Sequence, residues 1–158
     1  MRRFYPPFVG GWRAIGLLFI RLVVGTAMVL HGWQKIGNPF HWMDQMPSPP
    51  APFLQGLSVL AEVGGGAALI VGLLTPLAAL AVACDMFAAM ALVHWPHGDP
   101  FVPETATGPA YERALVYLAV SVGLMVLGPG RFSLDAMLLR SRDWVVEEKK
   151  EWLKISAA

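Results

Sequence analysis

Three ionisable side chains lie inside otherwise apolar stretches of this sequence: Arg21, Glu62 and Asp85. If those stretches cross a membrane, each charge costs at least about 2.5–3.5 kcal/mol to bury, so it pairs or faces a cavity. Arg21 and Glu62 lie at similar distances along the sequence from the same end of consecutive stretches, which favours an ion pair between them. The pair would either hold two helices in register or position a ligand headgroup and tune proton binding at Glu62.

A second set of polar residues lies nearer one end of the same stretches. His31 and Lys35 are four residues apart, so they share a helix face if the first stretch stays helical past Gly32. Residues from the third and fourth stretches add a histidine and a carboxylate at the same end. The two sets together predict a ligand-binding site, with Glu62 and His31 as candidate catalytic residues that handle protons: Arg21, His31, Lys35, Glu62, His94 and Glu112.

Methionines and histidines also raise the question of a metal. Met86, Met90 and His94 repeat every four residues, and His31 could join them. Thioether and imidazole ligands suit copper, although a methionine stripe at helical spacing is more often core packing. A copper site therefore stays an alternative, and no metal site is favoured. The single cysteine, Cys84, excludes an internal disulfide and a CxxC redox motif.

Four apolar segments must position these residues. At ~1.5 Å per residue, a helix of about 17–25 residues crosses the hydrocarbon layer of a bilayer. The chain has 56% hydrophobic and 15% charged residues, whereas soluble domains carry about 25% charged residues. We predict an all-α fold, a polytopic membrane four-helix bundle over residues 14–130, with spans at 14–32, 53–74, 76–93 and 110–127.

The segments outside the bundle differ in character. Residues 1–13 are predicted to be a cytoplasmic N-terminal segment, and residues 131–158 a cytoplasmic amphipathic tail whose helix lies on the membrane surface. The basic start followed by an apolar stretch could be a secretory signal. We interpret it instead as an uncleaved first span, because the stretch is long and contains Arg21.

The distribution of basic residues predicts the orientation. Lysine and arginine gather on the cytoplasmic side of membrane proteins. The two Pro- and Gly-rich loops, 33–52 and 94–109, share one side with Lys35 and Arg113. The side with the termini holds nine basic residues: Arg2, Arg3, Arg13, Arg131, Arg140, Arg142, Lys149, Lys150 and Lys154. We therefore expect both termini in the cytoplasm of a prokaryote and the bundle in its inner membrane. The net charge of +1 argues against a nucleic-acid partner.

An ordered set of short motifs resembles the DoxX family of small membrane proteins. The resemblance covers roughly residues 14–135, in matching order and spacing. Its pieces are Arg21-Leu22-Val23-Val24-Gly25, His31-Gly32-Trp33-Gln34-Lys35-Ile36, Ala61-Glu62 followed by glycines, Gly72-Leu73-Leu74-Thr75-Pro76, and Gly128-Pro129-Gly130-Arg131-Phe132-Ser133-Leu134-Asp135.

The resemblance implies a four-helix membrane bundle and a quinone-linked redox role. The family takes its name from a subunit of an archaeal quinone-linked complex, so a protein partner or a homo-oligomer is expected besides the lipid bilayer. A quinone would lie between the first two spans, with its carbonyls accepting hydrogen bonds from His31 and Lys35 and with Glu62 exchanging protons. Two other hypotheses stay open: a non-catalytic scaffold or assembly partner, and a copper-handling membrane protein.

Overall fold

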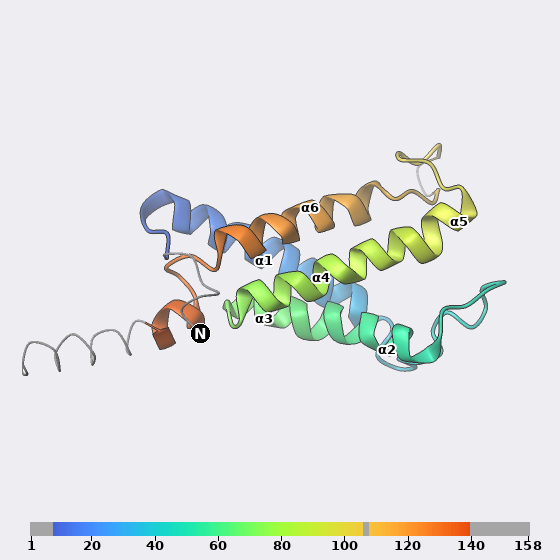
Figure 1. The fold of residues 1–158 in the computed structure, drawn as a ribbon, viewed down its shortest axis with the longest axis horizontal. Coiled ribbons are helices and arrows are strands. Elements are labelled where there is room, and N and C mark those ends of the chain that lie inside the picture. Colours follow the sequence, from blue (N-terminus) through green and yellow to red (C-terminus); the bar gives the residue numbers. More distant parts are fainter. Residues whose placement is uncertain (1–7, 106–107, 140–158) are drawn as a thin grey trace, which may run out of the picture.

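The computed structural model describes residues 8–105 and 108–139, and the secondary structure within these ranges is entirely helical. The prediction of an all-α fold is confirmed. The helices pack as parallel and antiparallel rods along one long axis (Figure 1). In chain order they are α1 (Gly11–Trp33), α2 (Pro52–Val59), η2 (Leu60–Gly65), α3 (Gly66–Val71), α4 (Thr75–Ala89), η3 (Met90–His94), α5 (Trp95–His97) and α6 (Glu112–Leu127).

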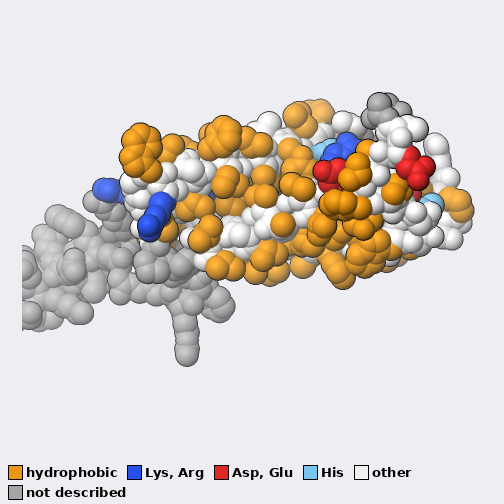
Figure 2. All heavy atoms as spheres, turned by 90° about the horizontal axis from the view of Figure 1, so that it is seen from above, with side chains coloured by type: hydrophobic (Ala, Val, Ile, Leu, Met, Phe, Trp, Pro, Cys, Tyr) orange, Lys and Arg blue, Asp and Glu red, His pale blue; other side chains and the backbone are white. Residues whose placement is uncertain are grey.

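Three continuous helices are long and apolar enough to cross a membrane. They are Gly11–Trp33, Pro52–Val71 and Thr75–His97, where the second and third each contain a π-helical segment, η2 and η3. α6 has 16 residues and is about 24 Å long at ~1.5 Å per residue, short of a ~30 Å hydrocarbon layer. Hydrophobic side chains cover the face shown in Figure 2, with charged ones gathered towards its two ends.

The tight turn between the second and third spans starts earlier than the sequence predicts. Gly72 and Leu74 have left-handed backbones, with φ of 70° and 48°, so the second span ends at Val71 rather than residue 74. Asp135 fixes this turn by accepting hydrogen bonds from the backbone N–H groups of Leu74 and Thr75, at 2.7 and 2.8 Å. The carboxylate thereby caps the start of α4, whose first N–H groups have no partner within the helix.

The two ends of the bundle carry different connections (Figure 1). We call the end with the connections 34–51 and 98–111 the loop end. The turn end carries the Gly72 turn, the start of α1 and residues 128–139. The predicted surface helix falls mostly on residues 140–158, which lie outside the described residues, as do residues 1–7.

Glycines bring α1 and the second span into direct backbone contact. A Cβ atom on Gly25 would lie 2.6 Å from the Gly66 carbonyl oxygen, and one on Gly66 would lie 2.8 Å from the Gly25 carbonyl oxygen. Small residues at such crossings let membrane helices gain dispersion energy, because lipid supplies no hydrophobic drive for association. Nearer the loop end, Gly32 of α1 lies against Glu62 and Val63 in the same way. These contacts fix the register of the two antiparallel helices.

Candidate functional site

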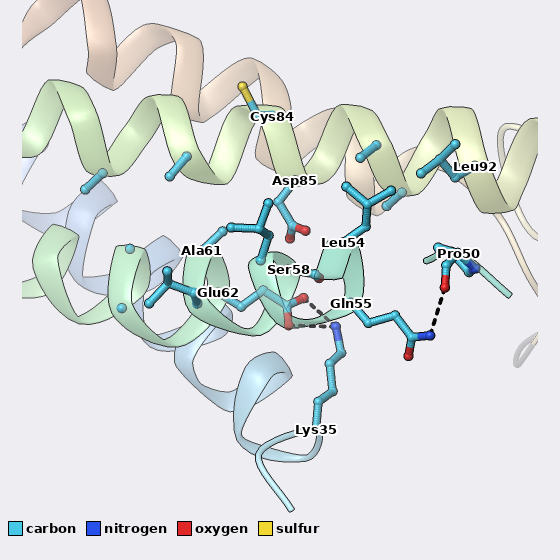
Figure 3. Close-up of a pocket in the computed structure, with 18 of the residues that line it drawn as sticks. Lys35, Pro50, Leu54, Gln55, Ser58, Ala61, Glu62, Cys84, Asp85 and Leu92 are labelled. Carbon is cyan, nitrogen blue, oxygen red and sulfur yellow. Dashed lines mark hydrogen bonds and ion pairs between the residues drawn. The ribbon is translucent and has the colours of Figure 1, made fainter. Parts of the chain in front are cut away.

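A groove of about 560 Å³ runs between the second and third spans (Figure 3). One wall comes from α2, η2 and α3, and the other from α4 and η3; we call it the α2–α4 groove. Its walls are mainly alanine and leucine side chains, among them Leu57, Leu60, Leu77 and Leu92, which are also exposed on the surface of the bundle. The groove is therefore an apolar trough that a lipid-soluble molecule can reach from the side.

A largely buried ion pair stands midway along this groove. Lys35 Nζ lies 2.7 Å from Glu62 Oε1 and 2.6 Å from Oε2. Glu62 is only 4% exposed, and the Lys35 ammonium also lies over the Trp42 ring, 4.1 Å from its centroid. A buried charge is tolerated when it is paired and hydrogen-bonded, so each partner stabilises the other in this apolar setting.

Asp85 supplies a second carboxyl group from the opposite wall. It lies on α4, and Figure 3 shows its side chain pointing into the groove towards Ser58 of α2. In residues 8–105 and 108–139, no lysine, arginine or histidine lies within ion-pair distance of Asp85. This middle part of the groove, which we call the polar stretch, therefore carries two carboxyl groups and one ammonium group.

The connection 34–51 folds over the loop end of the groove and is fastened there by Gln55. The Gln55 side chain accepts a hydrogen bond from the Met43 N–H at 2.9 Å and donates to the Pro50 carbonyl at 3.0 Å and to Asp44 Oδ1 at 3.3 Å. Gln55 is 2% exposed. One buried amide on α2 thus holds both the start and the end of the loop stretch that covers the ion pair.

We expect Gln55→Leu to release this loop. The substitution removes three hydrogen bonds and leaves the Met43 N–H without its acceptor, so local opening becomes easier. Hydrogen exchange should show the Met43 amide exchanging at least about tenfold faster, since about 1.4 kcal/mol corresponds to a factor of ten. Gln45→Leu, at an exposed position of the same loop, is the matched control. Unchanged exchange in Gln55→Leu would show that the loop is held by other contacts.

The predicted ion pair between Arg21 and Glu62 is wrong. Arg21 donates instead to backbone carbonyls of the second span and of the segment after α6, with Nε to Leu69 at 3.0 Å, one terminal nitrogen to Ile70 at 3.3 Å, and the other to Pro129. Glu62 lies beside Gly32, about three turns or roughly 16 Å along α1 from Arg21. Arg21 and Glu62 lie a similar number of residues from the loop end of their helices. They are nevertheless at different depths in the bundle, because α2 extends well past the end of α1.

The other predicted site residues lie at the loop end but do not line the groove. The His31 ring packs edge-on against Tyr117 of α6, with centroids 6.1 Å apart. His94 Nδ1 lies 2.7 Å from Asp99 Oδ2, and the Glu112 N–H donates to the Phe101 carbonyl. The structure therefore brings Lys35 and Glu62 together and leaves Arg21, His31, His94 and Glu112 elsewhere.

The methionines of the copper hypothesis belong to the core. Met86 and Met90 are 7% and 2% exposed and pack within the main hydrophobic cluster. The i→i+5 bonding of η3 interrupts the four-residue spacing that linked them to His94. In the described part of the chain, no group of three or more His, Cys, Asp or Glu residues could hold a metal ion.

Sequence reasoning missed two residues of the groove. Asp85 was recognised as a charge at mid-depth but was not assigned to the site, because nothing in the sequence shows which way it faces. Gln55 carried a usable signal, since it is a polar residue one turn into an apolar helix, directly after a Pro-rich loop. A buried amide in that place needs several hydrogen-bond partners, and loop backbone groups are the nearest supply.

Comparisons with known proteins show which proteins the chain is similar to. The family model described as DoxX matches residues 16–95, from α1 into α5. The chain is 30% identical over 131 residues to the uncharacterized membrane protein Rv3486 of Mycobacterium tuberculosis, covering 77% of this chain and 80% of that protein. It is 29% identical over 128 residues to the inner membrane protein YqjF of Escherichia coli, covering 78% of this chain and 92% of that protein. No solved structure matches the chain.

Proposed function

This chain belongs to the DoxX family of membrane proteins, and on that premise we propose that it holds a lipid-soluble quinone in the α2–α4 groove, as the quinone-binding part of a redox complex. The observation that carries the proposal is an apolar groove, open to the side, that holds the Lys35–Glu62 pair midway along its length. The site differs from the one predicted from sequence, since it lies between the second and third spans.

The groove suits a molecule with a flat polar head and an apolar tail. Its volume of about 560 Å³ is within the roughly 300–1,000 Å³ of typical ligand pockets. The leucine and alanine walls would take the tail, and the polar stretch with Lys35, Glu62 and Asp85 would take the head. When bound, a quinone supplies two-electron, two-proton redox chemistry. Glu62 is the group placed to hold or release a proton at the head, and a partner protein would exchange the electrons.

The membrane arrangement is part of the same proposal. We place α6 in the bilayer as a fourth span, with residues 108–111 extending it towards the loop end. The nine basic residues predicted on the termini side would face the cytoplasm, since basic residues gather there. The bundle would then be residues 14–130, flanked by the cytoplasmic segments 1–13 and 131–158, in the inner membrane of a prokaryote.

The test is quinone binding by purified protein in lipid nanodiscs. We expect wild-type protein to bind decyl-ubiquinone, and Ala81→Phe to weaken that binding at least about tenfold. The substitution puts a ring into the groove from the α4 wall and leaves both residues of the ion pair unchanged. Equilibrium titration followed by fluorescence quenching measures the dissociation constants.

His31→Ala is the control for this test, because His31 lies against Tyr117 and not in the groove. Binding should be unchanged in that variant. The proposal fails if wild-type protein binds no quinone, or if His31→Ala weakens binding while Ala81→Phe does not. Thermal unfolding of each variant shows whether a loss of binding reflects a loss of fold.

A scaffold function is the second candidate, and Arg21 favours it. Arg21 is 1% exposed, and its guanidinium donates hydrogen bonds to the backbone carbonyls of Leu69, Ile70 and Pro129. One of the predicted ligand residues therefore serves the fold. If the ion pair serves the fold in the same way, Glu62→Gln will lower the unfolding temperature, and no variant will alter quinone binding.

A further inference from the structure

The polar stretch of the α2–α4 groove is rich in hydrogen-bond acceptors. Glu62 faces it from η2 and Asp85 from α4, on opposite walls (Figure 3). An ionised carboxylate only accepts hydrogen bonds, through two oxygens with about four lone-pair positions. Among the described residues that line the groove, Lys35 is the one that carries a positive charge.

The ammonium group of Lys35 is largely committed. It lies within 2.7 Å of both Glu62 oxygens and over the Trp42 ring. An ammonium group has three N–H donors, and these contacts use two of them on the carboxylate and set the charge against the ring face. At most one N–H of Lys35 is therefore left for a ligand.

Asp85, by contrast, is in ion-pair contact with no cation of the described chain, and it accepts a hydrogen bond from the Ser58 hydroxyl. A carboxylate offers about four lone-pair positions, so this bond leaves room for a further donor, and such a donor stabilises the carboxylate because water is scarce beside lipid. The charges of the polar stretch, two carboxyl groups against one ammonium group, complement a headgroup that donates hydrogen bonds.

We propose that Asp85 is the specificity-determining residue of the groove and that it selects the hydroxyl-bearing quinol over the quinone. The proposal rests on the proposed function and deepens it. A quinone head offers only carbonyl acceptors, which meet other acceptors at Asp85 and Glu62. A quinol head offers two hydroxyl donors, and one of them reaches Asp85 while its ring lies between the two walls. This reverses the hydrogen-bond direction expected from the sequence, in which the protein donated to quinone carbonyls.

The experiment compares the two redox forms of one ligand. Dissociation constants of decyl-ubiquinone and decyl-ubiquinol are measured by equilibrium titration of the protein in nanodiscs, without oxygen for the quinol. We expect wild-type protein to bind the quinol at least about tenfold more tightly, as one hydrogen bond to a charged acceptor would give. Asp85→Leu should bring the ratio to about one, and Asp85→Asn, whose amide also donates, should lower it.

His31→Ala is the control here as well, since His31 lies against Tyr117 outside the groove and the ratio should stay at its wild-type value. Equal binding of both forms by wild-type protein, or an unchanged ratio in Asp85→Leu and Asp85→Asn, overturns the assignment of Asp85 but leaves a quinone site standing. If neither form binds, the proposed function fails together with this inference. Phospholipid acyl chains are then the occupant of the groove.

Discussion

Gly25→Val should leave almost no folded protein in the membrane. The new Cβ would lie 2.6 Å from the Gly66 carbonyl oxygen and 2.7 Å from the Ile70 side chain, closer than real Cβ contacts. Because one obstacle is backbone, a rotamer change cannot relieve the clash, and α1 must move away from α3. Overpacking costs about 1–3 kcal/mol when side chains can adjust, and a backbone clash costs more. Yield of monodisperse protein after detergent extraction measures the effect.

Gly16→Val provides the matched comparison for that experiment. Gly16 lies on the same helix, and a Cβ there would meet nothing within 4 Å. Both variants place the same β-branched residue in α1, so they share its small cost in helix propensity. Normal yield from Gly16→Val beside loss in Gly25→Val supports the close crossing of α1 and α3. Similar yields from the two variants would show that these helices are not in backbone contact.

Arg21→Met should be nearly as damaging, for a different reason. The substitution keeps an unbranched apolar stem but removes the donors to the carbonyls of Leu69, Ile70 and Pro129. The Leu69 carbonyl still accepts from the Gly72 N–H, whereas those of Ile70 and Pro129 lose this donor. Each buried carbonyl left without a partner costs about 1–3 kcal/mol, so a total loss of roughly 2 kcal/mol or more is expected. A large fall in unfolding temperature, followed by circular dichroism in detergent, is the expected result.

Two further variants make the Arg21 result specific. Arg21→Lys keeps the charge but lacks the planar fork that reaches three separate acceptors, so it should recover only part of the lost stability. Arg13→Met removes the charge of an exposed arginine on the same helix and should leave the unfolding temperature nearly unchanged. If Arg21→Met unfolds at the wild-type temperature, the carbonyls of Ile70 and Pro129 must find other donors.

Much of the fold could be predicted from the sequence because hydropathy reports burial in lipid directly. The apolar runs gave the three long helices with errors of a few residues at their ends. Thr75-Pro76, predicted as the tight turn, begin α4, and the turn itself lies just before them, at Gly72–Leu74. The errors at the ends have local causes. Gly72 takes a left-handed backbone and stops α3 early, whereas Pro96 occupies the first turn of α5 and lets the third rod continue to His97.

The candidate site could be predicted only in part, because which side chains pair depends on how the helices are shifted along one another. Hydropathy shows that Glu62 must be paired but not which cation it meets. Lys35 is the partner because the chain turns back after Trp33 and carries the ammonium over Trp42 to the groove. The direction in which Asp85 points depends on the same packing, which no single helix encodes.

The π-helical segment η2 affects which changes of sequence this membrane protein can tolerate. A π-turn holds one residue more than the α-helical turn it replaces, so it behaves as a single-residue insertion within a continuous helix. The glycine crossing at Gly66 lies on one side of that insertion, and the wall of the groove that includes Ser58 lies on the other. The α2 half and the α3 half can therefore turn their side chains in different directions around the helix axis. Sequence change in the α2 half can reshape the cavity while the α3 half holds its contact with α1.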